Sequence, residues 1–120
     1  MIVFTSTPER GLIVLEPKGR LDTAAAPKLE AAVNDALASG NSMIIDLGET
    51  TYISSMALRV LLFAAKNAAA KGNAFAVSAP TANVANVLRM AGFTAILHVH
   101  DNLPAAFAAV RQEARSRPPD

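Results

Sequence analysis

Cysteine is absent from this 120-residue sequence, and aromatic residues make up only 5% of it. Without cysteine the chain has no disulfide framework and no thiolate chemistry, which fits a reducing compartment. Because 52% of the residues are hydrophobic but few are aromatic, the core must be built from Ala, Val, Leu and Ile. The length is typical of one domain with a single core.

An excess of either charge and a long apolar run are lacking as well. The 11 basic and 10 acidic residues give a formal net charge of +1, so nothing favours nucleic acid or a membrane surface. Apolar segments are too short and too interrupted to span a bilayer, and residues 1–11 lack the pattern of a signal peptide. We therefore expect a soluble cytoplasmic protein that binds neither nucleic acid nor membrane.

Hydrophobic patterning predicts an α/β fold. Runs rich in β-branched residues at 2–6 and 12–15, with a turn at 8–11, predict an N-terminal hairpin. The patterns then alternate, predicting helix 24–37, strand 43–47, helix 55–71, strand 74–78, a helix from 80 to 91, strand 95–99 and helix 103–115. This order indicates a mixed, mostly parallel β-sheet with about four α-helices. We expect residues 1–115 to form one domain and 116–120 to be a disordered tail.

The first two predicted helices have clear starts and apolar faces. Asp22 or Thr23 can cap the helix at 24–37, and Pro27 falls in its first turn, where its missing N–H is tolerated. Its apolar face comprises Leu29, Ala32, Val33, Ala36 and Leu37. In the helix at 55–71 the apolar residues three and four apart are Leu58, Leu61, Leu62, Ala65 and Ala69. The apolar run 43–47 before it predicts a strand covered on both faces.

Two adjacent hydroxyls, Ser54 and Ser55, stand where the second helix begins. Serine is a preferred N-cap, and a cap stabilises a helix by about 1 kcal/mol. Only one of the two serines can be the cap. A phosphate on the second would lie at the positive end of the helix dipole and would add roughly −1.5 to −2 charges.

Catalysis and metal binding have weak support. A serine nucleophile needs a base, and the only histidines are His98 and His100 in the last predicted strand. The G-x-S-x-G pattern is also missing around the serines. His98 and His100 would share a strand face beside Asp101, but without a further ligand cluster surface histidines are favoured. We therefore expect that the protein is not an enzyme, has no catalytic residue and binds neither a metal nor a cofactor.

Three segments resemble the STAS domain, and within it the bacterial anti-sigma factor antagonists. Residues 19–23 (Gly-Arg-Leu-Asp-Thr) resemble the family's segment between a strand and the first helix. Residues 46–58 resemble its signature of Asp-Leu, an aromatic, an apolar residue, then serine and leucine. Gly92-Phe93 before an apolar run resembles its C-terminal part. The resemblance covers nearly the whole chain and implies the STAS fold.

The resemblance also implies a function, namely partner switching in transcription regulation. In that family, a cognate anti-sigma factor that is also a serine kinase phosphorylates the serine at the start of the second helix. By alignment that serine is Ser55, with Ser54 as the second choice. The unphosphorylated antagonist binds the kinase and frees the sigma factor. The phosphorylated form is released until a serine phosphatase restores it.

Residues around Ser55 are then expected to contact the partner, and they are Asp22, Thr23, Thr51, Ser54, Met56 and Arg59. Gly48, Ser54, Met56 and Ala57 depart from the family pattern, which has serine, an acidic residue, serine or alanine, and glycine there. We expect Met56 to be exposed as a flexible apolar anchor. The alternative is a STAS domain without a phosphate switch, acting as a scaffold or a transporter accessory subunit, with Ser55 only a cap. The oligomeric state is not implied.

Overall fold

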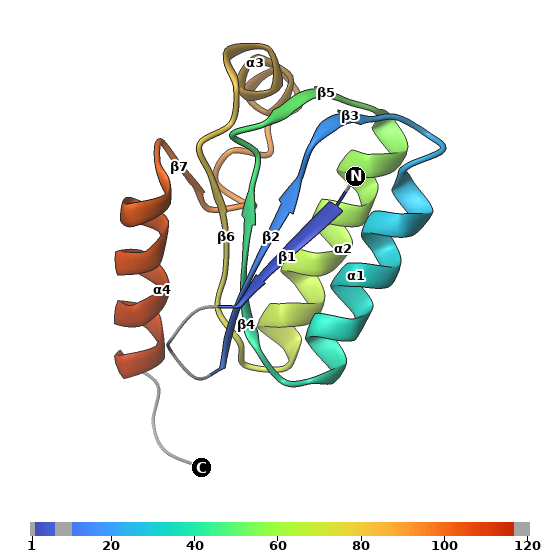
Figure 1. Cartoon of the computed structure of the whole chain (residues 1–120). Coiled ribbons are helices and arrows are strands. Elements are labelled where there is room, and N and C mark those ends of the chain that lie inside the picture. Colours follow the sequence, from blue (N-terminus) through green and yellow to red (C-terminus); the bar gives the residue numbers. More distant parts are fainter. Residues whose placement is uncertain (1, 7–10, 117–120) are drawn as a thin grey trace.

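The alternating patterns fold into two sheets and four helices in the described part of the chain, residues 2–6 and 11–116 of a computed structural model (Figure 1). The elements are β1 (Ile2–Ser6), β2 (Leu12–Pro17), β3 (Gly19–Leu21), α1 (Ala26–Ala38), β4 (Ser42–Asp46), β5 (Thr50–Ile53), α2 (Ser55–Ala70), β6 (Phe75–Ser78), α3 (Ala82–Met90), β7 (Val99–His100) and α4 (Leu103–Ser116). Most of the turn predicted at 8–11, and of the tail predicted at 116–120, lies outside the described residues.

The main sheet confirms the α/β prediction. Its strand order is β1-β2-β4-β6-β7, in which β1 pairs antiparallel with β2 and every other pairing is parallel. The apolar run at 43–47 forms the middle strand, β4, whose residues 42–45 are all buried. A parallel strand with both faces covered has this continuous apolar character rather than an alternating one.

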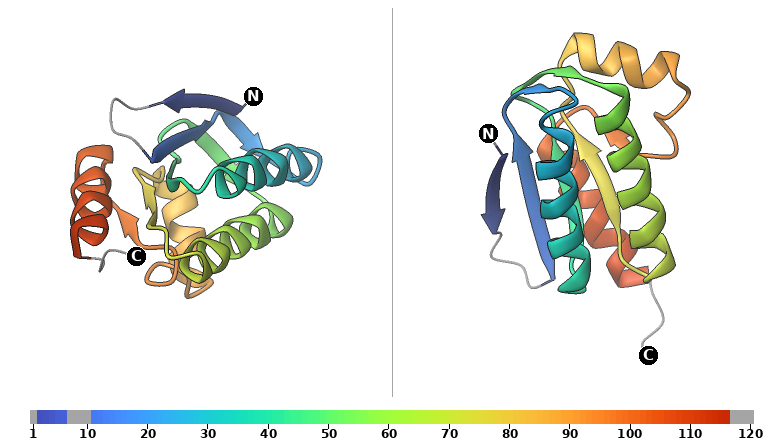
Figure 2. Two further views of the ribbon diagram at one scale, coloured as in Figure 1. Left: turned by 90° about the horizontal axis from the view of Figure 1, so that it is seen from below. Right: turned by 90° about the vertical axis from the view of Figure 1, so that its right-hand side faces the viewer.

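Helices cover both faces of this sheet (Figures 1 and 2). The α1 and α2 helices lie side by side on one face, and α4 packs on the opposite face. Alternate residues of β4 serve the two cores, since Met43 and Ile45 face α1 and α2 whereas Ile44 faces α4. The smaller core, under α4, consists of Leu12, Val14, Ile44, Ala74, Ala76, Ala106 and Val110.

A second, two-stranded parallel sheet, β3 with β5, was not predicted. Its strands have three and four residues, too few for an alternating pattern to emerge from the polar corner. Backbone hydrogen bonds bracket it, with the Gly19 N–H donating to the Glu49 carbonyl and the Ser54 N–H to the Leu21 carbonyl, each at 2.8 Å. This small sheet therefore ties the segment before α1 to the segment before α2.

The start of α1 corrects a sequence prediction. The helix begins at Ala26 rather than Ala24, with Ala25 as an N-cap whose side chain makes no cap hydrogen bond. Asp22 Oδ1 instead accepts a hydrogen bond from the Ala25 N–H at 2.9 Å. Asp22 thus caps the turn that precedes the helix, with the three-residue spacing of an N-cap side chain, and Thr23 is exposed on that turn. The apolar face predicted for α1 is confirmed as buried.

Two further predictions are corrected in the second half of the chain. The last strand, β7, is Val99–His100, because residues 94–98 form turns and His98 has a left-handed φ of 51°. On α2, Leu61 and Ala65 are buried as predicted, but Leu58 and Leu62 are half-buried and Ala69 is exposed. The helix packs against both α1 and the sheet, so its buried face also includes Ala57, Val60, Ala64 and Ala68.

Candidate functional site

The start of α2 separates the two serines. Ser54 is the N-cap, and its Oγ accepts a hydrogen bond from the Ala57 N–H at 3.1 Å. Its own N–H donates to the Leu21 carbonyl, and its carbonyl accepts from the Leu58 N–H at 2.9 Å. With only 7% of its surface exposed, Ser54 is a structural residue that fixes the helix start.

Ser55 is the first residue of α2 and is exposed. Among the described residues its hydroxyl makes no hydrogen bond. It lies at the end of a 16-residue helix where the backbone N–H groups give a positive potential. An exposed hydroxyl at this place can accept a phosphate without any core residue moving.

The neighbouring departures from the family signature have local explanations. The Gly48 N–H donates to Asp46 Oδ1 at 2.9 Å, and a Cβ on Gly48 would lie 3.2 Å from that oxygen. The Asp46 carboxylate therefore crowds the place that a serine side chain would need. Ala57 is fully buried, so its methyl group belongs to the core and not to the exposed surface.

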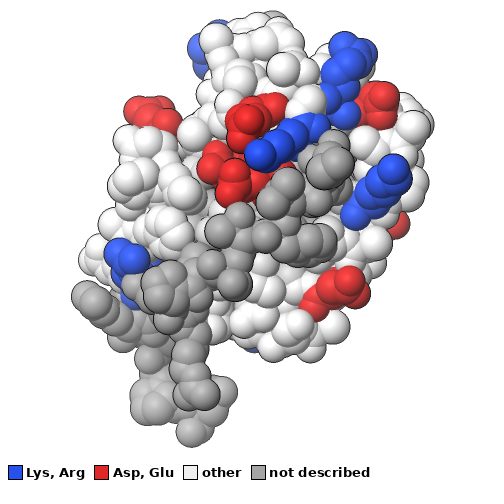
Figure 3. All heavy atoms as spheres, in the orientation of Figure 1, with Lys and Arg blue, Asp and Glu red and all other residues white. Residues whose placement is uncertain are grey.

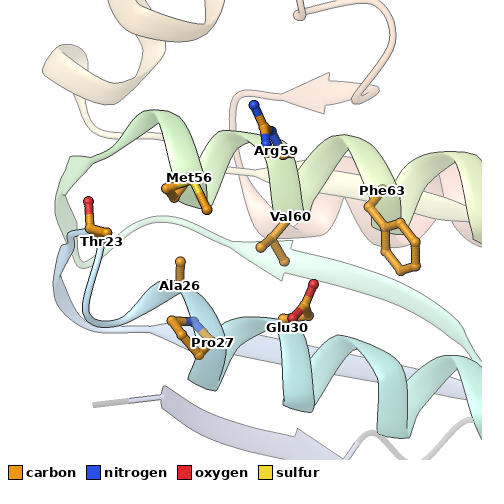
Figure 4. A pocket seen from close by; sticks show the side chains of 8 residues that line it. All are labelled: Thr23, Ala26, Pro27, Glu30, Met56, Arg59, Val60 and Phe63. Carbon is orange, nitrogen blue, oxygen red and sulfur yellow. The ribbon is translucent and has the colours of Figure 1, made fainter.

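Of the other residues predicted to contact a partner, three line one groove and two lie outside it. Thr23, Met56 and Arg59 line one groove between α1 and α2, about 320 Å³ in volume (Figure 4). We call it the α1–α2 groove, and its lining is Thr23, Ala26, Pro27, Glu30, Met56, Arg59, Val60 and Phe63. Met56 is 44% exposed, so its predicted exposure is confirmed, while its role as an anchor stays a prediction. Thr51 is exposed and Asp22 half-buried, and both lie outside the groove lining.

The groove also contains a residue that sequence reasoning missed. Phe63 is 44% exposed, an unusual environment for a phenylalanine. Its spacing of seven from Met56 places both side chains on one line along α2, and this spacing was the available signal. The apolar face predicted for this helix includes neither Val60 nor Phe63, so the i, i+4, i+7 line that they form with Met56 was not singled out.

The small sheet has one exposed aromatic contact. The guanidinium carbon of Arg20 on β3 lies 4.3 Å from the ring centroid of Tyr52 on the paired strand β5. This is cation–π geometry, and Tyr52 remains 37% exposed. The Tyr52 ring of this contact lies three residues before Ser55 in the sequence.

Neither a broad charged patch, on the face drawn in Figure 3, nor a cluster of metal-ligating side chains is seen in the described part of the chain. On the face drawn in Figure 3, basic and acidic side chains are interspersed, and neither sign forms a broad field. Within residues 2–6 and 11–116, no three His, Cys, Asp or Glu side chains gather as metal ligands would. None of the helices described is both long and apolar enough to cross a membrane.

The fold and the signature at the start of α2 define the protein class. The STAS domain family model matches residues 5–106, and the chain belongs to this family. BtrV of Bordetella bronchiseptica, assigned as an anti-sigma factor antagonist, is 30% identical over 102 residues, which are 84% of this chain and 88% of BtrV. The chain is therefore a STAS domain protein of the anti-sigma factor antagonist family, as its motifs predict.

Solved structures share the fold. An anti-sigma factor antagonist from Mycobacterium paratuberculosis superposes with a TM-score of 0.82 at 23% identity, covering 92% of this chain and 95% of that one. Unphosphorylated SpoIIAA, an anti-sigma factor antagonist, gives 0.76 at 18% identity, with 92% and 97% covered. The phosphorylated form of SpoIIAA, a Bacillus cell fate determinant, gives 0.69 at 18% identity, with 91% and 100% covered.

Proposed function

We propose that this protein is a partner-switching antagonist controlled by phosphorylation of Ser55. In the unphosphorylated state it binds an anti-sigma factor that is also a serine kinase, and the sigma factor is freed. Transfer of phosphate from ATP to the Ser55 hydroxyl releases the complex, and a serine phosphatase restores the binding form. The protein itself has no catalytic role in this scheme and acts in the cytoplasm.

The difference between the two serines is the observation that carries this proposal. The Ser54 hydroxyl is buried and accepts the capping hydrogen bond, so a kinase could reach it only by opening the helix start. The Ser55 hydroxyl is exposed and engaged with no other described residue. The assignment as an antagonist of BtrV, and the existence of SpoIIAA in both phosphorylated and unphosphorylated forms, agree with such a switch.

Electrostatics supply the reason for release. A phosphoserine carries roughly −1.5 to −2 charges, and its burial in an interface would require desolvation of those charges. The Ser54 N–H donates to the Leu21 carbonyl. This hydrogen bond joins the residue before Ser55 to the residue before Asp22, so it brings the Asp22 carboxylate close to Ser55. Phosphorylation would thus concentrate negative charge at one end of the small sheet. The partner, which binds Ser55 as a neutral hydroxyl, would then face this charge across the interface.

The experiment is incubation with the cognate kinase and ATP, followed by intact mass and peptide mapping. We expect a mass gain of one phosphate, located on Ser55. Ser55→Ala should abolish the gain, and Ser54→Asn should retain it because asparagine is an equally good N-cap. A phosphate on Ser54 would move the switch to the capping residue. No mass gain under any condition would contradict the proposal and favour constitutive docking, as a scaffold or transporter accessory subunit.

A further inference from the structure

We infer that the α1–α2 groove is a second anchor point, which receives apolar side chains from an amphipathic helix of the anti-sigma factor. This inference rests on the proposed function, because it assumes that the same partner covers Ser55. It extends the partner surface from Thr23, Met56 and Arg59, which are expected to contact the partner around Ser55, to the far end of the groove at Phe63.

The side of the groove formed by α2 is apolar, although the exposed face of an amphipathic helix normally carries polar residues. Met56 and Phe63 are both 44% exposed, and Val60 between them is 7% exposed. Figure 4 shows these three side chains directed toward α1, with Met56 over Ala26 and Phe63 at the other end of the groove, beyond Glu30. Two large exposed apolar side chains that share a hollow are unlike the scattered single ones found on most surfaces. A helix inserted by its apolar face is a common occupant of such a groove.

The charges at the groove favour an amphipathic protein segment over a purely apolar ligand. Glu30 extends from α1 and Arg59 from α2, and both line the groove. Neither forms an ion pair with another described residue. A partner helix that carries a basic and an acidic residue beside its apolar face would satisfy both charges. A lipid acyl chain with a single charged headgroup would leave Glu30 or Arg59 without a partner of opposite charge.

Size argues that the groove is part of a larger interface. About 320 Å³ holds only a few side chains, whereas a stable interface buries roughly 800 Å² on each partner. A patch of that area has a radius of roughly 16 Å. Phe63 follows Ser55 by eight residues, about 12 Å along the helix axis. A partner that covers Ser55 can therefore also reach the groove, whose nearest lining residue, Met56, is the next in sequence.

Binding to the purified anti-sigma factor tests this inference with a matched pair of variants. Phe63→Ser removes the apolar side chain at the far end of the groove, and Met90→Ser removes a 78% exposed methionine of α3 that does not line it. We expect Phe63→Ser to weaken binding at least tenfold and Met90→Ser to leave it unchanged. Circular dichroism and thermal unfolding of both variants confirm that each is folded.

The outcomes separate this inference from the proposed function when wild-type protein is titrated in its unphosphorylated and phosphorylated forms. Equal affinity of Phe63→Ser and wild type would overturn the groove assignment and leave the switch intact. If phosphorylation left the affinity unchanged but Phe63→Ser lowered it, the phosphorylation switch would be overturned and the groove assignment supported. Light scattering of the chain alone gives a third result. If Phe63→Ser abolished self-association of the wild type, the occupant would be a second copy and the inference would be wrong.

Discussion

The Oγ of Ser54 accepts a hydrogen bond from the Ala57 N–H at 3.1 Å and so closes the first turn of α2. The side chain of Ser54 is consequently buried, while that of Ser55, the next residue, is exposed. Two identical side chains that are adjacent in sequence are thus given different environments by a single capping interaction. The proposed switch depends on this difference, and it can be tested through stability as well as through binding.

Ser54→Ala should lower the free energy of unfolding by about 1–2 kcal/mol, because it removes a buried N-cap. Urea denaturation followed by circular dichroism measures this change. Ser55→Ala is the matched control and should alter stability by less than about 0.5 kcal/mol, since the side chain is exposed and forms no cap. Similar losses for the two variants would contradict the division of roles described above.

Thr50→Val should be destabilising by about 1–3 kcal/mol. The Thr50 Oγ1 is buried and donates to the Pro17 carbonyl at 2.7 Å, which ties β5 to the end of β2. Valine has the same shape but leaves that acceptor without this donor. The exposed neighbour gives the comparison: Thr51→Val should change the free energy of unfolding by no more than about 0.5 kcal/mol.

Two adjacent leucines of α2 should respond differently to truncation. Leu61 is fully buried, and Leu61→Ala should reduce the free energy of unfolding by about 2–5 kcal/mol. Leu62 is only half-buried, so Leu62→Ala should cost markedly less, about 1 kcal/mol. Chemical denaturation of the pair tests which face of α2 is turned to the core. The reverse order of the two losses would mean that the helix is rotated from the orientation described.

The Arg20–Tyr52 contact should show a measurable coupling energy. A double-mutant cycle with Arg20→Ala and Tyr52→Ala should give about 0.5–1 kcal/mol, as expected for a cation–π pair at an exposed site. Tyr52→Phe retains the ring and should retain the stability as well. A coupling energy indistinguishable from zero would show that the contact does not stabilise the small sheet.

Much of the fold was predictable because most of its elements are long or strongly patterned. The apolar face of α1 and the continuous run of β4 indicated a helix and a central strand covered on both faces, and the structure agrees. The β3–β5 sheet was missed because its strands are too short to show a period. The last strand was displaced because residues 94–98 are apolar in part but form turns.

The candidate site was predictable only in part. A serine pair at a helix start is visible in the sequence, but which hydroxyl is the cap depends on the φ and ψ of one residue, Ser54. Phe63 was missed because it lies outside the apolar face predicted for α2 and no motif draws attention to it. Its exposure follows from the way α1 packs beside α2 and leaves a groove between them, and packing of that kind has no local signature.

The central claim is that charge on Ser55 controls binding, and calorimetric titration against the cognate anti-sigma factor tests it most directly. Ser55→Ala should bind as tightly as the unphosphorylated wild type. Ser55→Asp should bind at least about tenfold more weakly, because its carboxylate would have to be desolvated in the interface. Ser54→Asn, which keeps the cap, should resemble the wild type. Equal affinities of Ser55→Ala and Ser55→Asp would contradict the claim.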